Sequence, residues 1–518
     1  TAASLDSRGG VLSSLNGLLQ TRLSGVLRNG QGGKIEGSRL DLQALGGIYS
    51  DGGRIAANTG NILLNAGGNA LDNSGGGIYA KGFEKVDAGS MNNNAGQVSG
   101  SAIDLGVGGN LSNQGGLIES ASTLAIRAAN LDNQSGKLRA LGTSGKTDFQ
   151  IGSQFDNRNG LVETANNDFT INTKAANGNI TLQGAIDGNW NNFVLISGSG
   201  TVTTTATAPM TEVATLTLQD NSGLSNGTIN LNASIAVDWI EVFPQNYAVN
   251  ILGSSNTVGV RSYYKYGNTQ HPVFHNTGGV RFGDDATDYI WFRERLTSVA
   301  STTTVTGVIE ANSTIAFGNV IVSNTASLIS TGGGDVNITG NVSGSGATLR
   351  FGENTDGFMN YRITGNVTLG TLTTFADDTS ITFLEDVTLE TPTTLLNQRI
   401  QLGDAADDIT SVAGIFNASA VSLLSLGGTV VTTGGAITIS TVNLLAPAVL
   451  DTTSGGTSAA ISVTRIVGNS SLAVDAGTTA GATIAIAEMA HLTGGLTVRN
   501  AGGLVTLGAL GGSASGPV

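Results

Sequence analysis

Two clusters of aspartate residues are the side chains in this sequence best suited to chemistry. Their members are Asp284, Asp285 and Asp288, beside Arg281, and Asp404, Asp407 and Asp408. Clustered carboxylates bind calcium, and they also supply general acids and bases to enzymes that cleave polysaccharides. The competing interpretation is that Gly-Asp pairs form Asx-type turns at strand ends. We therefore predict no catalytic residue and no cofactor. A structural calcium ion bound by these aspartates is the alternative that stays open.

An aromatic cluster between residues 239 and 292 holds the candidates for partner contact. This window contains 11 of the 26 aromatic side chains of the chain, with arginines among and just beyond them. We assign contact with a sugar or a protein to Tyr263, Tyr264, Tyr266, Trp291 and Arg293, because Tyr, Trp and Arg dominate binding energies at interfaces. The alternative is that the aromatic rings fill a local core, since they bury large areas wherever a core must be filled.

The histidines do not suggest a metal site. His271 and His275 are four residues apart, a spacing that brings two ligands together on a helix. Pro272 and the strand-rich surroundings argue against a helix, and no carboxylate nearby completes the ligand set that zinc requires. We predict no metal ligand among the histidines.

The backbone that carries these side chains is predicted from a repeat in the first third of the chain. Each copy begins with a large apolar residue, which is followed by a polar residue and then usually by Asn. A Gly comes next, and a second apolar residue lies seven positions after the first. The copies begin at Leu71, Met91, Leu111, Leu131 and Phe155. The first four starts are evenly spaced, and the fifth comes four positions later than that spacing predicts. A fixed period near 20 is typical of a solenoid, in which each repeat is one coil.

Stacked coils place residues of equal repeat position over one another, about 4.8 Å apart. We expect two or three short strands in each coil, separated by sharp bends. Two apolar columns and one amide column follow from the repeat. The first apolar column is Leu71, Met91, Leu111 and Leu131, and the second is Ile78, Val98, Ile118 and Leu138. The amide column is Asn73, Asn93, Asn113, Asn133 and Asn157. Amide side chains stacked in this way can hydrogen-bond along the column.

The repeat in residues 1–173 resembles the repeats of filamentous haemagglutinin and the contact-dependent growth inhibition exoproteins. These are large adhesin-like proteins of Gram-negative bacteria that are exported by two-partner secretion. The resemblance implies a right-handed parallel β-helix, an extracellular location (cell-surface or secreted) and an outer-membrane partner during export. The family's secretion domain and its toxin are not recognisable in this sequence, so neither is carried over.

The texture of the sequence changes after residue 173. Thr/Val/Ile-rich strands recur at a looser spacing, and are loosely similar to passenger regions of large bacterial adhesins. We expect a continued β-solenoid over 174–238, an aromatic-rich lobe or widened coils over 239–296, and an irregular Thr/Val-rich solenoid over 297–518. A different all-β array or a fused second module after residue 173 is the alternative.

Composition supports an all-β protein and narrows its partners. The 518 residues include 76 Gly but only 6 Pro, no Cys, and no apolar run long enough to span a membrane as a helix. The net charge is −14, of which residues 174–518 carry −13. An acidic surface repels nucleic acid and anionic membranes, so we expect neither as a partner.

These features together predict a structural and adhesive segment of a bacterial exoprotein. Each coil of about 20 residues lengthens the solenoid by about 4.8 Å along its axis, so the full chain would form a rod more than about 100 Å long. Such a rod would carry a distal binding or effector module, or present its own surface to a receptor or glycan on a host or neighbouring cell. Exposed end coils would allow self-association. A carbohydrate-active β-helix enzyme and a passive matrix or filament subunit are the alternatives.

Overall fold

The structure, a computed structural model, describes residues 2–142, 146–165, 168–174, 177–182, 186–207, 209–222, 225–261, 271–352, 359–375 and 380–511. Strands dominate this part of the chain, and η4 (Ser454–Gly456) is a single 3₁₀ turn. No helix in the described residues has the length and apolar character that crossing a bilayer takes. The predicted all-β class is therefore confirmed.

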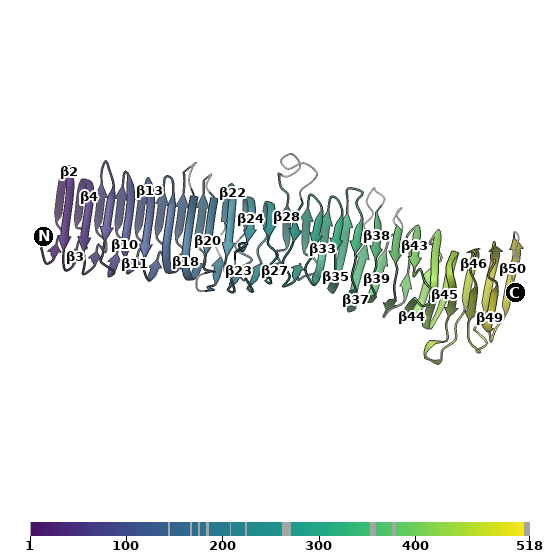
Figure 1. The fold of residues 1–518 in the computed structure, drawn as a ribbon. Coiled ribbons are helices and arrows are strands. Elements are labelled where there is room, and N and C mark those ends of the chain that lie inside the picture. The colour runs from purple at the N-terminus through teal and green to yellow at the C-terminus, as the bar shows by residue number, and fades with distance from the viewer. Residues whose placement is uncertain are drawn as a thin grey trace. The chain divides into compact units, whose positions relative to one another are not determined.

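The chain forms two compact units, and each is a solenoid of parallel strands (Figure 1). Unit 1 contains residues 1–265 and 274–278, and unit 2 contains residues 266–273 and 279–518. The division falls inside the aromatic-rich window of the sequence. Strand β29 (Val273–Phe274) contains one of the boundary positions.

The strands of unit 1 are short, and most have two to six residues. They are β1 (Leu5–Asp6), β2 (Val11–Leu23), β3 (Leu27–Arg28), β4 (Lys34–Ala44), β5 (Ile48–Tyr49), β6 (Arg54–Ala57), β7 (Ile62–Asn65), β8 (Ala70–Asp72), β9 (Gly77–Ala80), β10 (Phe83–Ala88), β11 (Ser90–Asn92), β12 (Gln97–Gly100), β13 (Ala102–Val107), β14 (Asn110–Ser112), β15 (Leu117–Ser120), β16 (Leu124–Asp132), β17 (Lys137–Ala140), β18 (Lys146–Asn157), β19 (Leu161–Thr164), β20 (Asp168–Asn172), β21 (Ile180–Leu182), β22 (Ile186–Ile196), β23 (Thr201–Thr204), β24 (Met210–Leu218), β25 (Thr228–Leu231), β26 (Ile235–Val242), β27 (Ala248–Ile251) and β28 (Ser255–Val258).

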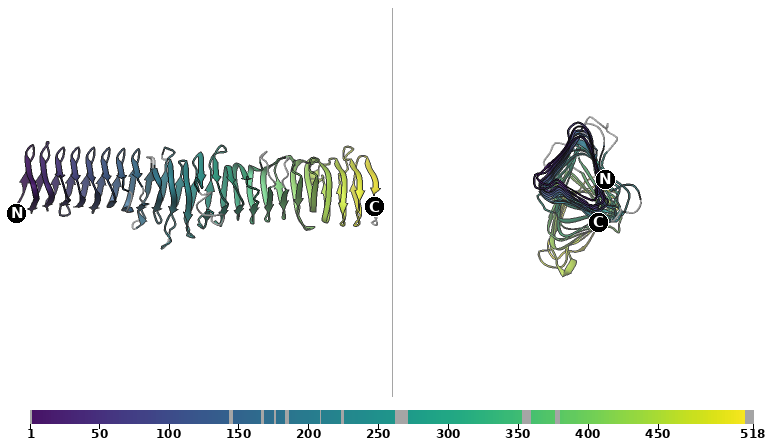
Figure 2. Two further views of the ribbon diagram at one scale, coloured as in Figure 1. Left: turned by 90° about the horizontal axis from the view of Figure 1, so that it is seen from above. Right: turned by 90° about the vertical axis from the view of Figure 1, so that its left-hand side faces the viewer.

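Three strands make one coil of unit 1, and each strand pairs with its counterpart in the next coil. Thus β8 pairs with β11, β9 with β12, and β10 with β13, all in parallel. The coils consequently form three parallel sheets around a central core. Seen end-on in Figure 2, the N-terminal coils (purple) superpose on one triangular outline.

The apolar columns predicted from the repeat are confirmed. Leu71 lies opposite Met91, Met91 opposite Leu111, and Leu111 opposite Leu131. The second column is equally in register, from Ile78 through Val98 and Ile118 to Leu138. All of these side chains are buried, because alternate residues of each strand point into the coil.

The amide column is also confirmed, and it is fully buried. From Asn73 to Asn133, each amide nitrogen donates a hydrogen bond to the amide oxygen of the next asparagine in the column. The distances are 2.7 Å from Asn73 to Asn93, 2.6 Å from Asn93 to Asn113, 2.6 Å from Asn113 to Asn133 and 2.5 Å from Asn133 to Asn157. The fifth copy joins this asparagine ladder even though it arrives late in the sequence.

The turn after each ladder asparagine explains the glycines of the repeat. A Cβ on Gly116, three residues after Asn113, would lie only 2.2 Å from the carbonyl oxygen of Asn93 in the preceding coil. The residue before this glycine has a positive φ in five successive repeat copies: Gly75, Ala95, Gly115, Ser135 and Asn159. One position therefore excludes any side chain, while the other only favours glycine.

Unit 2 has the same architecture with longer and less uniform strands. They are β30 (Val280–Phe282), β31 (Tyr289–Phe292), β32 (Leu296–Ser298), β33 (Thr303–Ala311), β34 (Ile315–Phe317), β35 (Val320–Ser330), β36 (Val336–Ile338), β37 (Val342–Phe351), β38 (Asn360–Ile363), β39 (Val367–Thr374), β40 (Ser380–Phe383), β41 (Val387–Leu389), β42 (Thr393–Thr394), β43 (Arg399–Leu402), β44 (Ile409–Ala418), β45 (Leu423–Asp451), β46 (Ile461–Gly468), β47 (Leu472–Asp475), β48 (Ile484–Ala490), β49 (Leu496–Asn500) and β50 (Val505–Gly511).

An interior column of unit 2 shows how its coils vary in length. The residues in register are Ile315, Val336, Tyr361, Ile381, Ile400 and Leu424. The coil from Val336 to Tyr361 is the longest of this series, and the coil from Ile381 to Ile400 is the shortest. Large aromatic side chains contribute to this interior, since Phe351, Tyr361 and Phe383 are all buried. The looser spacing read from the sequence is thus real variation within one kind of coil.

The aromatic-rich window serves in part as core. Tyr247, Phe274, Phe282 and Phe292 have no exposed surface, which confirms the core-filling interpretation for these four residues. The Phe282 and Phe292 rings meet edge to face with their centroids 5.7 Å apart.

Candidate functional site

A groove crosses several coils of unit 1 on the outer surface of the sheet formed by β13, β16, β18 and β20. It is open to solvent and has a volume of about 660 Å³. Its polar lining consists of Arg127, Gln150, Asn172, Lys174, Asp220 and Ser222. The groove lies entirely within unit 1.

Three of the polar groups form a column along the groove. Arg127 lies opposite Gln150, and Gln150 lies opposite Asn172, on three successive coils. Their strand neighbours Ile126, Ile151 and Ile171 are buried in the core. Because side chains alternate along a strand, the polar three point outward, spaced by the distance between paired strands.

Small residues make the floor of the groove low. Gly108, Ala128, Ala129 and Gly152 line it, together with Ile151. The register of β16 against β18 shifts between Ala128 and Asn130, which marks a β-bulge. A bulge bends the strand and re-aims its side chains, so the small residues and the irregular register together create the hollow.

Two side chains of the column are held by local hydrogen bonds. Arg127 donates from Nη2 to Oδ1 of Asp104 at 2.5 Å, which also forms an ion pair. Gln150 donates from Nε2 to Oδ1 of Asp148 at 2.6 Å. These contacts fix the two side chains against the sheet surface while leaving each exposed.

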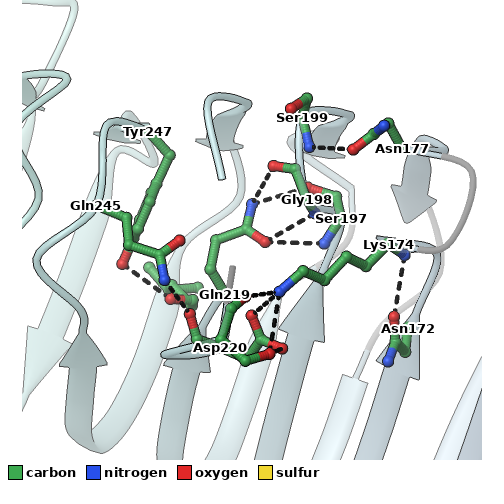
Figure 3. Close-up of polar contacts among 12 residues, drawn as sticks. Asn172, Lys174, Asn177, Ser197, Gly198, Ser199, Gln219, Asp220, Gln245 and Tyr247 are labelled. Carbon is green, nitrogen blue, oxygen red and sulfur yellow. Dashed lines mark hydrogen bonds and ion pairs between the residues drawn. The ribbon is translucent and has the colours of Figure 1, made fainter. Parts of the chain in front are cut away.

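A lysine bridge borders the groove where the chain leaves β20 (Figure 3). The Nζ atom of Lys174 forms an ion pair with Asp220 and contacts the carbonyl oxygen of Ser222. Lys174 and Asp220 are 46 residues apart, so the lysine reaches across an intervening coil. A Cβ on Gly198 in that coil would lie 3.0 Å from Cγ of Lys174, so the absence of a side chain there leaves the lysine its path.

The turn that carries Asp220 is anchored to the coil before it by Gln219. This side chain is fully buried, and its residue has a positive φ of 67°. Its Oε1 accepts hydrogen bonds from the backbone N–H groups of Ser197 and Gly198, both at 3.0 Å. Its Nε2 donates to Oγ of Ser197 at 2.9 Å. Gln219 thereby holds Asp220 in place for the lysine.

The same turn is anchored to the coil after it. Gln245 donates from Nε2 to the carbonyl oxygen of Asp220 at 2.9 Å. The Tyr247 hydroxyl donates to the carbonyl oxygen of Leu218 at 2.9 Å and accepts from the N–H of Phe243 at 2.8 Å. Burial raises the pKa of the Tyr247 hydroxyl, so it stays protonated and keeps donating.

The electrostatics of the lysine bridge favour the charged forms of both partners. Partial burial by itself would raise the pKa of the Asp220 carboxyl. Hydrogen bonds from Lys174 and Ser222 outweigh burial, so the pKa of Asp220 lies below its ordinary value. Asp220 is therefore ionised at neutral pH and acts as a hydrogen-bond acceptor, and the groove as a whole offers paired charges, amides and a hydroxyl.

The residues predicted for partner contact lie elsewhere. Tyr263, Tyr264 and Tyr266 are outside the described residues. Trp291 and Arg293 lie together on unit 2, where the Arg293 guanidinium is 4.6 Å from the centre of the Trp291 ring. A cation over an aromatic face is stabilising, and the contact role of this pair stays a prediction.

The predicted aspartate clusters act as turn caps. Oδ2 of Asp288 accepts hydrogen bonds from the N–H groups of Asp284 and Asp285, at 2.8 and 2.9 Å. Asp408 does the same for Asp404 and Ala405, both at 2.8 Å, and Asp407 is exposed.

Both clusters thus lie in turns, but the capping carboxylates are Asp288 and Asp408, and the aspartates of the Gly-Asp pairs contribute backbone N–H groups. Within the described residues, no group of three acidic or histidine side chains is placed to hold a metal ion. Calcium at these turns stays a prediction.

Sequence reasoning missed the groove, although part of its signal was present. Gln150 is the outward residue of the strand Phe149-Gln150-Ile151, and alternation alone predicts its exposure. The partnership of Lys174 with Asp220 depends on the lengths of two turns between them. Because coil length varies after residue 157, no fixed spacing pointed to this pair.

Comparison with protein-family models, curated proteins and solved structures gives no match to this chain. The resemblance of residues 1–173 to filamentous haemagglutinin repeats therefore stays a hypothesis from the sequence.

Proposed function

We propose that this chain is a structural and adhesive segment of a large bacterial exoprotein, located at the cell surface or secreted. Its role is to hold a binding surface in a fixed position. That surface belongs either to its own coils or to a binding or effector module joined to them. Export through an outer-membrane secretion partner belongs to the same proposal, because a chain with no Cys forms no disulfide that would hinder passage in an unfolded state.

The observation that carries the proposal is the coupling of successive coils in unit 1. Backbone pairing joins every coil to the next on three sheets, and the asparagine ladder adds a buried side-chain bond at one corner. A unit bonded in this way resists bending and shearing, because any movement of one coil breaks bonds to two others. Such a scaffold suits a protein that must present a surface under mechanical load.

The outward surface supplies the second argument. Outward positions of the strands tolerate many residue types without cost to the core, so they can be adapted to a receptor or glycan. The groove is one place where outward residues of several coils converge. The acidic charge of residues 174–518 disfavours nucleic acid as the partner.

Adhesion of the purified chain tests this proposal. Beads coated with the folded chain should bind host or neighbouring bacterial cells more than beads coated with the urea-unfolded chain. Equal binding by both coatings would contradict an adhesive role and would favour a passive matrix subunit. Incubation with uronate polymers and calcium addresses the enzyme alternative, since release of unsaturated ends would replace the proposal with a lyase.

A further inference from the structure

The two cations that line the groove of unit 1 each have a carboxylate partner. Arg127 is paired with Asp104, and Lys174 is paired with Asp220. A strongly anionic ligand would have to compete with these carboxylates for the two cations. A cationic ligand would be repelled by the two cations beside it. A ligand that fits this groove is therefore neutral and binds through hydrogen bonds.

The amides in the centre of the groove have hydrogen-bonding capacity to offer. Among the described residues, Gln150 uses its Nε2 atom and Asn172 uses its Oδ1 atom, which accepts from the N–H of Lys174 at 3.0 Å. Across the same residues, neither the Gln150 Oε1 atom nor the Asn172 Nδ2 atom has a hydrogen-bond partner. The pair thus presents one acceptor and one donor on adjacent coils.

The arrangement repeats along the direction in which the coils stack. Arg127, Gln150 and Asn172 follow one another at strand spacing, and Asp220 and Ser222 border the end of this row. A ligand with hydroxyl groups recurring along its length can use several of these positions at once. The small residues Ala129 and Gly152 leave room for the C–H face of a sugar ring.

A peptide fits this surface less well. Peptides that bind to sheets usually add a strand to an open edge. In the groove the strands β16, β18 and β20 are already paired with one another, so the groove lies over a face and offers no edge.

We propose that the groove of unit 1 is a binding site for a neutral oligosaccharide that lies across the coils. Gln150 and Asn172 bond its hydroxyl groups, Arg127 and Ser222 add contacts at the two ends, and the Lys174–Asp220 bridge fixes the wall. The inference rests on the proposed adhesive function, for which it names the class of ligand.

Binding of defined sugars to the full chain tests the inference. The probes are a panel of neutral hexasaccharides (cello-, malto-, xylo- and mannohexaose, and neutral host-type glycans) and acidic oligogalacturonates, measured by titration calorimetry. At least one neutral member should bind with a Kd below about 1 mM. Raising NaCl from about 50 to about 500 mM should change this Kd less than twofold, because no net charge is neutralised.

Two substitutions locate the binding in the groove. Gln150→Ala removes the exposed amide, and Asn172→Asp keeps the Oδ1 acceptor for the turn but removes the Nδ2 donor. Each should weaken binding about fivefold, the value of one hydrogen bond. Gln97→Ala, which removes an amide from β12, is the matched control and should leave the Kd unchanged. Unfolding midpoints of all three variants should stay close to that of the parent chain.

Three outcomes would overturn the inference: binding of acidic sugars alone, no neutral binder, or equal Kd values for the parent chain and both groove variants. Cell adhesion separates this failure from failure of the proposed function. If no neutral sugar binds the parent chain while the coated beads still adhere, the adhesive role stands and the groove does not. If sugar binds but the coated beads do not adhere, the groove stands and the adhesive role does not.

Discussion

The asparagine ladder of unit 1 and the aspartate turns of unit 2 hold coil corners with different polar bonds. In unit 1 the corner asparagines bond from coil to coil, as Asn93 does to Asn113 at 2.6 Å. In unit 2 the carboxylates of Asp288 and Asp408 bond to N–H groups of their own turns. A bond between coils forces each coil to match its neighbour, whereas a bond within a turn places no demand on the next coil. The evenly spaced coils from Leu71 to Leu131 all carry a ladder asparagine, whereas coil length varies along the column of unit 2 that starts at Ile315.

The largest effect is expected from Gly116→Ala in unit 1. The new methyl group would lie 2.2 Å from the carbonyl oxygen of Asn93, so the coils must separate locally. We expect a loss of about 3 kcal/mol in the opening free energy of this coil, measured by amide hydrogen exchange. Gly115→Ala is the control, because a Cβ there meets nothing within 4 Å. An equal loss in both variants would show that φ, and not contact between coils, governs the turn.

Breaking the ladder itself is expected to cost slightly less. Asn113→Ala removes the acceptor of Asn93 and the donor to Asn133. We expect a loss of about 2 kcal/mol, because two buried amides lose their partner. Protection should fall in the coils before and after residue 113 as well as in its own coil. A loss confined to one coil would refute coupling through the ladder.

A third substitution tests the interior of unit 1 where it departs from its own pattern. Glu84 lies opposite Ile62 and Ile103 in an apolar column, is fully buried, and neither of its carboxyl oxygens has a hydrogen-bond partner among the described residues. Replacing it with Ile restores the column, and we expect a gain of about 2 kcal/mol in unfolding free energy at neutral pH.

The pH dependence of the Glu84 effect has a defined sign. Burial raises the pKa of Glu84 well above its ordinary value, so the folded chain keeps this proton when the unfolded chain has lost it. Stability therefore falls as pH rises from the ordinary pKa toward the raised one, with a slope of about 1.4 kcal/mol per pH unit. Glu84→Gln should remove this slope while keeping a buried polar group. A difference between parent and Glu84→Ile that does not grow with pH would contradict the assignment.

In unit 2 the matching substitution is Asp408→Ala. It removes the acceptor for the N–H groups of Asp404 and Ala405, but Asp404 is exposed and water can replace part of the bonding. We expect a loss of about 1 kcal/mol that stays within this turn, followed by hydrogen exchange. Asp407→Ala, at an exposed position, should change little. Loss of protection in the neighbouring coils would erase the proposed contrast with unit 1.

The smallest effect is expected at a position where the turns of unit 1 differ among themselves. Ala95 has a φ of 53° at the site that Gly75 and Gly115 occupy in neighbouring coils. Ala95→Gly relieves this backbone strain but adds freedom to the unfolded chain, so we expect a net gain of about 0.5 kcal/mol. Urea denaturation of the variant beside the parent chain measures it, and a loss of stability would show that the turn does not strain alanine.

The sequence predicts structure well where the coils repeat regularly and poorly where their lengths vary. The repeat starting at Leu71 predicted both apolar columns and the asparagine ladder, because bonds between coils impose a strict period. The burial of Tyr247 and Phe282 was open beforehand, since aromatic rings suit either a core or a binding face. The Lys174–Asp220 bridge was out of reach, because turns of variable length separate its partners. The 20-residue repeat could be recognised in the sequence, whereas the groove includes residues beyond the last copy of that repeat.

The asparagine ladder has a direction, since the amides from Asn73 to Asn133 all donate toward the following coil. Any cassette of one coil that begins and ends at equivalent ladder positions can be duplicated or excised without leaving an orphan donor in the interior. Removal of residues 94–113, for example, would let Asn93 bond directly to Asn133. A change in the number of these coils, such as recombination between repeats would produce, thus keeps the ladder bonds intact with no compensating substitution in the ladder.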